Sequence, residues 1–214
     1  MNHSINLSLV ANPTQIENEW DILTELFEAG LEKFYLRRPN LRLRKYEECL
    51  NNIPDRFRER VVLHEHFTIM YDYPFKEIHL KTKERKAFQN KERYKKLVNE
   101  AHRANIKCST SVHNFSELKD LDGTIGSIWV SPVFDSISNP SHKADFDWIL
   151  GLKNYTSKSK VVAIGGIHEN NIGALNRQSF YETALLGSIW ERPKSAIEYF
   201  KLMQKSCKQG TQSL

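Results

Sequence analysis

Short apolar segments alternate with helical patterns eight times along this chain, and no linker-like or low-complexity stretch interrupts them. Such alternation predicts a parallel sheet, because each crossover helix returns the chain to the same edge. Eight units favour a closed barrel over an open sheet. We therefore predict an α/β fold, a single-domain (β/α)8 TIM barrel over residues 1–214 with a frayed tail at 209–214. The predicted strand segments are 5–11, 34–36, 61–67, 78–80, 106–112, 128–130, 161–167 and 184–189.

Two capping-box patterns mark expected helix starts. Thr14 and Glu17 precede a helical apolar stripe, and Asn114 and Glu117 precede a short helix after the fifth strand. No G-x-G-x-x-G follows the first strand, which argues against a dinucleotide-binding fold.

Composition indicates a soluble globular protein, with 40% apolar and 27% charged residues. No apolar run reaches the roughly 18 residues of a membrane span, and no signal peptide is evident. Three distant cysteines without C-x-x-C indicate buried or semi-buried thiols in a reducing cytoplasm. The net charge of +5 is spread over predicted helices, so we expect small anionic ligands rather than nucleic acid or a membrane.

The last two strand segments both end in glycine. Gly165-Gly166 lies near the end of the seventh and Gly187-Ser188 near the end of the eighth. Glycine lets backbone N–H groups approach a ligand closely, and a barrel commonly binds phosphate after strands seven and eight. The pair predicts a phosphate cradle, although two core strands with turn glycines would give the same pattern.

Other polar residues gather at predicted strand ends, where barrels place functional side chains. Arg37 would bind an anion or form an ion pair with Glu65. His64 and His66 are two apart on a predicted strand, so they would face one side and hold a metal or pack in the mouth. His79 fits a hydrogen-bonded core histidine. The further strand-end residues are Arg38, Lys81, Glu84, Ser109, Ser111, His113, Ser131, Asp135, Ser136, Ser138 and Asn139.

Five short motifs occur in order over about residues 5–204. They are Tyr35-Leu-Arg37, Ile78-His-Leu80, Ser111-x-His113 with Glu117, Ser131-Pro-Val-Phe134, and Val162-Ala-Ile-Gly-Gly-Ile167. Together they resemble the thiamine phosphate synthase family (thiamine-phosphate pyrophosphorylase), which includes the TenI-type thiazole tautomerases. The run from Ser131 to Ser138 is similar to the Bacteroidetes-type branch.

The resemblance implies a transferase of thiamine biosynthesis that joins hydroxymethylpyrimidine diphosphate to thiazole phosphate with the help of Mg²⁺. Arg37 and Ser111, supported by Arg38, would contact the pyrophosphate, and Glu65 and Glu84 would bind the metal. The substrate-binding residues would be Gly165, Gly166, Gly187, Ser188, His113, Ser136, Ser138, Asn139 and Lys143.

Departures from the family pattern leave alternatives open. Glu65 and Glu84 stand where the family has aspartates, and Asn139 stands where its lysine would fall, with Lys143 as a substitute. A catalytically weak paralogue that binds thiamine-pathway phosphates would fit these changes. A tautomerase is disfavoured, because Pro132 occupies the position of its histidine. A related sugar-phosphate barrel enzyme would share only the phosphate cradle with this chain. Whether the protein forms a homo-oligomer is left open by the sequence.

Overall fold

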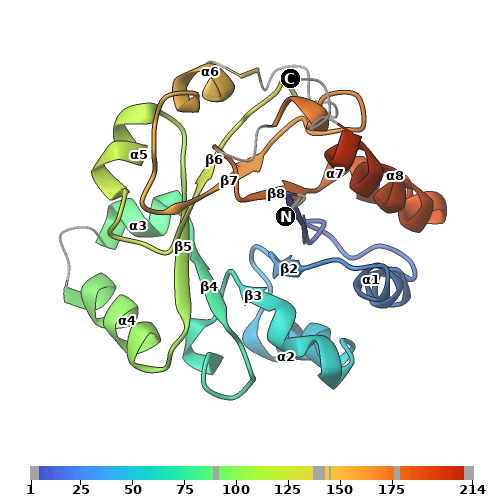
Figure 1. Ribbon diagram of the computed structural model, residues 1–214. Coiled ribbons are helices and arrows are strands. Elements are labelled where there is room, and N and C mark those ends of the chain that lie inside the picture. Colours follow the sequence, from blue (N-terminus) through green and yellow to red (C-terminus); the bar gives the residue numbers. More distant parts are fainter. Residues whose placement is uncertain (1–4, 89–91, 137–142, 145, 176–178, 210–214) are drawn as a thin grey trace.

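The computed structural model describes residues 5–88, 92–136, 143–144, 146–175 and 179–209. The strands in these ranges close into a parallel barrel, in which each pairs with the next and β8 pairs with β1 (Figure 1). This confirms the predicted (β/α)8 architecture. The strands are β1 (Asn6–Val10), β2 (Lys33–Leu36), β3 (Val61–Leu63), β4 (Glu77–Leu80), β5 (Lys107–Val112), β6 (Ser127–Val130), β7 (Lys160–Ile164) and β8 (Glu182–Leu185).

Helices surround the barrel on its outer side (Figure 1). The α-helices are α1 (Glu19–Glu28), α2 (Leu43–Asn51), α3 (Thr82–Phe88), α4 (Glu92–Arg103), α5 (Phe115–Leu121), α6 (Trp148–Leu152), α7 (Gly187–Trp190) and α8 (Ala196–Gln209). The 3-10 helices are η1 (Asp55–Arg60), η2 (Phe67–Ile69), η3 (Ile172–Ala174) and η4 (Pro193–Ser195). In the described part of the chain, no helix has the length and apolar character of a membrane span.

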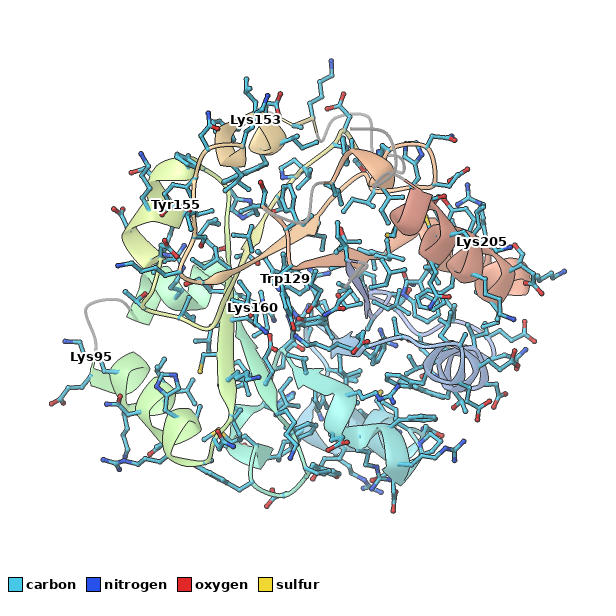
Figure 2. All side chains as sticks on the ribbon, in the orientation of Figure 1. Lys95, Trp129, Lys153, Tyr155, Lys160 and Lys205 are labelled. Atoms are coloured by element: carbon cyan, nitrogen blue, oxygen red, sulfur yellow. The ribbon has the colours of Figure 1, made fainter. Side chains whose placement is uncertain are left out.

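Side chains alternate along each strand between the barrel interior and the layer under the helices. On β2, Phe34 and Leu36 join the outer core, whereas Tyr35 points inward. Figure 2 shows Trp129 near the centre of the barrel. The inward cluster consists of Val10, Tyr35, Val62, Trp129, Val162 and Ala184.

An ion-pair network closes the amino-terminal end of the barrel. The Nζ of Lys33 lies 2.9 Å from carboxylate oxygens of both Glu77 and Glu182. The hydroxyl of Tyr35 donates to Glu182 over 3.0 Å. Burial alone would lower the pKa of Lys33, but the two carboxylates outweigh it and raise that pKa.

Several predicted boundaries were wrong, the first of them at α1. This helix begins at Glu19, and its N-cap Asn18 makes no side-chain capping bond. Thr14 instead accepts hydrogen bonds from the Asn12 side chain in the preceding loop. The capping box at Asn114 is half confirmed. Its side chain accepts from the Glu117 N–H over 2.9 Å, but the Glu117 carboxylate binds basic side chains of α3.

The third and eighth strands are shorter than predicted. β3 ends at Leu63, because the chain turns at His66, which has a left-handed φ of 54°. β8 ends at Leu185, and Gly187 begins α7. At the carboxyl end, α8 extends to Gln209, and residues 210–214 lie outside the described ranges. The three cysteines are free and buried, as expected.

Candidate functional site

A small cavity of about 120 Å³ lies at the carboxyl ends of β7 and β8. It is lined by Ser136, Ile164, Gly165, Gly166, Ile167, Ala184, Leu185, Leu186, Gly187 and Ser188. Hydrogen bonds among the described residues use none of the N–H groups of Gly165, Gly166, Gly187 and Ser188. The two predicted glycine-containing segments therefore meet around one cavity with unused backbone donors, which suits an anion of phosphate size.

Glycine is required at this cavity for two reasons. Gly165 and Gly166 have φ values of 103° and 65°, which side-chain-bearing residues rarely adopt. A Cβ on Gly166 would also lie 2.2 Å from the carbonyl oxygen of Asp135 and 2.6 Å from that of Phe134. The loop after β6 thus packs directly on the backbone of the cradle.

Basic side chains gather at the ends of β2 and β4. Alternation places Arg37 and Lys81 on the inward side, and both lower the pKa of the interior imidazoles of His64 and His79. Arg37 is half-buried and has no hydrogen bond or ion pair with any described residue. Glu65 pairs with Lys81 instead of Arg37. Of the two alternatives for Arg37, the structure therefore contradicts the ion pair with Glu65.

Arg38 faces away from this cluster. Its guanidinium forms a buried ion pair with Glu19 and donates to the carbonyl of Asn12. It also lies over the ring of Trp20, 5.8 Å from the centroid. Arg38 is only 3% exposed, so the structure contradicts its predicted contact with pyrophosphate. The reason is strand alternation, because consecutive residues after β2 point to opposite sides.

Of the two alternatives for His64 and His66, the structure favours packing over a shared metal site. The His64 ring stacks on that of His79 in the interior, with centroids 4.4 Å apart. His66 instead places Nε2 2.7 Å from the carbonyl oxygen of Leu41. The two residues do not face one side, because β3 ends before His64. A metal site shared by His64 and His66 is therefore wrong.

His79 belongs to a hydrogen-bonded chain that also holds Ser111. Its Nδ1 and Nε2 each lie 3.0 Å from a hydroxyl oxygen, of Ser109 and Ser111 respectively. Ser109 donates to the carbonyl of Ile78, so Nδ1–H of His79 donates to Ser109 and Nε2 accepts from Ser111. Burial, followed by Lys81 and Arg37, lowers the pKa of His79 to about 3. The predicted hydrogen-bonded core histidine is confirmed.

His64 is equally buried but lacks such partners. It is 3% exposed, and neither ring nitrogen has a hydrogen-bond partner among the described residues. Burial, with smaller contributions from His79, Lys81 and Arg37, holds its pKa well below the usual value. Both interior imidazoles are therefore neutral near pH 7.

Of the remaining predicted site residues, one lines the cradle, two are exposed, and three lie wholly or partly outside the described part of the structure. Ser136 lines the cradle, and exposed His113 has Nδ1 3.2 Å from the carbonyl oxygen of Ser131. Lys143 is exposed. Glu84 lies in α3, but its side chain is outside the described part of the structure. Ser138 and Asn139 lie wholly outside the described residues.

One cavity beside the basic cluster was not anticipated. It has about 690 Å³ and lies between the loop after β2, η2 and α4, with Leu41, Phe67, Met70 and Leu97 in its wall. Glu65 also lines it, so the cavity adjoins the ion pair with Lys81. The aromatic and apolar run after the third predicted strand was the available signal. Its wall combines these apolar side chains with the charged residues Glu65, Lys96 and Glu100.

Solved structures resemble this chain over nearly its whole length. Thiamine phosphate pyrophosphorylase from Bacteroides thetaiotaomicron is 25% identical, with a TM-score of 0.71, and the match covers 94% of this chain and 97% of that one. The thiamine phosphate pyrophosphorylase from Pyrococcus furiosus is 14% identical, with a TM-score of 0.75 and 96% of both chains covered. 

Another barrel enzyme is a more distant structural match. (S)-3-O-geranylgeranylglyceryl phosphate synthase from Thermoplasma acidophilum, in complex with its substrate sn-glycerol-1-phosphate, is 13% identical, with a TM-score of 0.64. That match covers 97% of this chain and 94% of that one. Neither the models of protein families nor the curated proteins give a match. The structural matches agree with the resemblance carried by the five sequence motifs, and the protein has a thiamine phosphate synthase-like fold of the TenI type.

Proposed function

We propose that this protein is a thiamine phosphate synthase-like transferase, which joins hydroxymethylpyrimidine diphosphate to thiazole phosphate. The observation that carries the proposal is that two arrangements suited to anions lie at one end of the barrel. One is the cradle with unused N–H groups, and the other is the basic cluster at Arg37 and Lys81. A reaction between two phosphorylated molecules needs both. The thiamine phosphate pyrophosphorylases among the structural matches support the same reaction class.

The proposed reaction needs stabilisation of a departing anion more than it needs a base. The thiazole nitrogen attacks the methylene carbon of the pyrimidine, while the bond from that carbon to the pyrophosphate oxygen breaks. Pyrophosphate leaves with the bonding electron pair, so negative charge grows on its oxygens. Cationic groups placed at these oxygens lower the barrier, because they interact more strongly with the transition state than with the substrate.

We assign the pyrophosphate to Arg37 and Lys81, and the thiazole phosphate to the cradle. Ser111 can donate to the pyrophosphate only by turning its hydroxyl away from Nε2 of His79. Gly165, Gly166 and Ser188 would hold the second phosphate through their N–H groups. Free, buried thiols support the expected cytoplasmic location.

The implied Mg²⁺ does not fit the described residues well. The Glu65 carboxylate already accepts from Lys81 and from the backbone N–H of Arg38. Groups of three or more potential metal-binding side chains are also absent among the residues that the structure describes. We therefore derive no step from a metal.

A second candidate function is a binding paralogue with weak turnover. The pairing of Glu65 with Lys81, at a position where the family resemblance implies a metal ligand, favours it. Such a protein would bind the same two phosphorylated molecules and release little product.

Product formation tests the proposal. The purified protein is incubated with both precursors and Mg²⁺, and thiamine phosphate is measured over time. We expect steady formation in the wild type and a loss of about 10²–10³-fold in Arg37→Ala, because a charge-assisted donor to the leaving group is removed. Lys143→Ala, an exposed change of equal charge, tests whether Lys143 serves as the missing lysine. Binding of both precursors without product would favour the paralogue, and failure to bind either would contradict both functions.

A further inference from the structure

Glu65 sits in a closed set of contacts at the end of β3. Lys81 follows β4 and donates from its ammonium to one carboxylate oxygen of Glu65. The other oxygen accepts the backbone N–H of Arg38 over 3.1 Å. The Glu65 side chain is only 12% exposed and that of Lys81 is 30% exposed. Each oxygen of this partly buried carboxylate therefore already accepts one hydrogen bond, one of them from a cation.

The electrostatic surroundings oppose a second cation beside Glu65. Burial lowers the pKa of His64 and His79 most, and Lys81 and Arg37 lie close enough to lower these pKa values further. A divalent ion at Glu65 would have to displace the ammonium of Lys81 and accept repulsion from Arg37. Mg²⁺ also gives up its water ligands reluctantly and needs near-octahedral oxygen donors.

We propose that the ammonium of Lys81 takes the place of a divalent cation in this mouth, and that a diphosphate is held there by Lys81 and Arg37 without a metal. The proposal rests on the assignment of the pyrophosphate to this cluster. A lysine ammonium is a compact point charge that binds phosphate oxygens well. Glu65 then orients Lys81 and limits its motion, while Arg37, which has no ion pair with a described residue, keeps its donors for the anion.

Two binding measurements test the proposal on the intact protein. Calorimetry with inorganic pyrophosphate is done in excess Mg²⁺ and in EDTA, with correction for the magnesium–pyrophosphate complex. We expect wild-type affinities that agree within about threefold, and a loss of at least about tenfold in Lys81→Ala under both conditions. Lys83→Ala, an exposed lysine two residues further on, is the matched control and should keep the wild-type affinity.

Mn²⁺ binding to the protein alone is the second measurement, read by electron paramagnetic resonance. We expect no saturable binding in the wild type and saturable binding in Lys81→Asp, which frees Glu65 and adds a second carboxylate. Lys83→Asp, with the same change in charge, should behave as the wild type.

The proposal is overturned if Mg²⁺ tightens wild-type pyrophosphate binding tenfold or more. It is also overturned if the wild type binds Mn²⁺ as well as Lys81→Asp does, or if Lys81→Asp gains none. If pyrophosphate binds under neither condition, the proposed function fails, while the Mn²⁺ comparison still decides whether Lys81 occupies the position of a metal.

Discussion

At the scale of single residues, Gly166 shows why a cradle of backbone donors is sensitive to one methyl group. Its φ of 65° and the carbonyl oxygens of Phe134 and Asp135 leave no space for a Cβ. Any side chain must therefore move the loop after β6 as well as strain the backbone. Stability and anion binding are linked at this position.

We predict that Gly166→Ala lowers the free energy of unfolding by about 2–4 kcal/mol and weakens phosphate binding. Urea unfolding and calorimetry with inorganic phosphate measure the two effects. Gly173→Ala is the control, because Gly173 is exposed in η3 and its φ is not positive. Equal free energies of unfolding for the two variants would show that the loop after β6 moves aside without loss of stability.

At the scale of elements, β2 sends two consecutive arginines to opposite sides. Arg37 joins the basic cluster at the mouth, whereas Arg38 forms the buried ion pair with Glu19 of α1. Glu19 is 1% exposed, so loss of its partner would leave a buried carboxylate without compensation. The same residue type thus supports ligand binding at one position and helix packing at the next.

Substitutions of Arg37 and Arg38 should have different effects on stability and on pyrophosphate binding. Arg38→Ala should lower the free energy of unfolding by about 3–5 kcal/mol and leave pyrophosphate affinity unchanged, since it removes one partner of a buried pair. Arg37→Ala should abolish pyrophosphate affinity and leave the free energy of unfolding nearly unchanged. Urea unfolding and calorimetry on both variants check this. If both lose stability equally, Arg37 also has a structural role.

Sequence periodicity predicted the strands, the barrel and the cradle, because each depends on local patterns of apolar residues and glycine. The same patterns did not show that Arg37 and Arg38 have different roles. Continuing the strand alternation from the inward Tyr35 would have placed only Arg37 on the inward side. Sequence periodicity could not predict the ion pairs Glu19–Arg38 and Glu65–Lys81, because each joins residues from different elements. The left-handed turn at His66 was also missed, because no glycine or asparagine marks it.

At the scale of the whole molecule, the neutral interior imidazoles link folding to pH. Burial holds the pKa values of His64 and His79 below the ordinary histidine value of about 6.5, and that of His79 is about 3. Between these values the unfolded chain binds protons that the folded protein does not. Stability is therefore fully present above about pH 6.5 and falls as the pH is lowered toward the folded pKa.

We predict that each of these two imidazoles lowers the free energy of unfolding by up to about 1.4 kcal/mol per pH unit below pH 6.5. Urea unfolding at pH 7, 6 and 5 gives the slope, above the range where most carboxylates titrate. His64→Phe keeps a ring against His79 but removes one titrating group, so its slope should be clearly smaller. Identical slopes in wild type and variant would mean that His64 does not contribute.

The ion-pair network that closes the amino-terminal end of the barrel has a consequence for the opposite end. Lys33 neutralises only one of its two carboxylates, Glu77 and Glu182, so this end of the described interior carries a net negative charge. At the mouth, Arg37 and Lys81 exceed Glu65 by one positive charge. Among these interior side chains alone, the excess positive charge lies at the mouth, while Arg60, Lys76, Lys107 and Lys160 surround the amino-terminal end together with Glu32 and Glu59. We expect this local positive charge to attract anions to the mouth before contact forms, and their association to slow as added salt screens it.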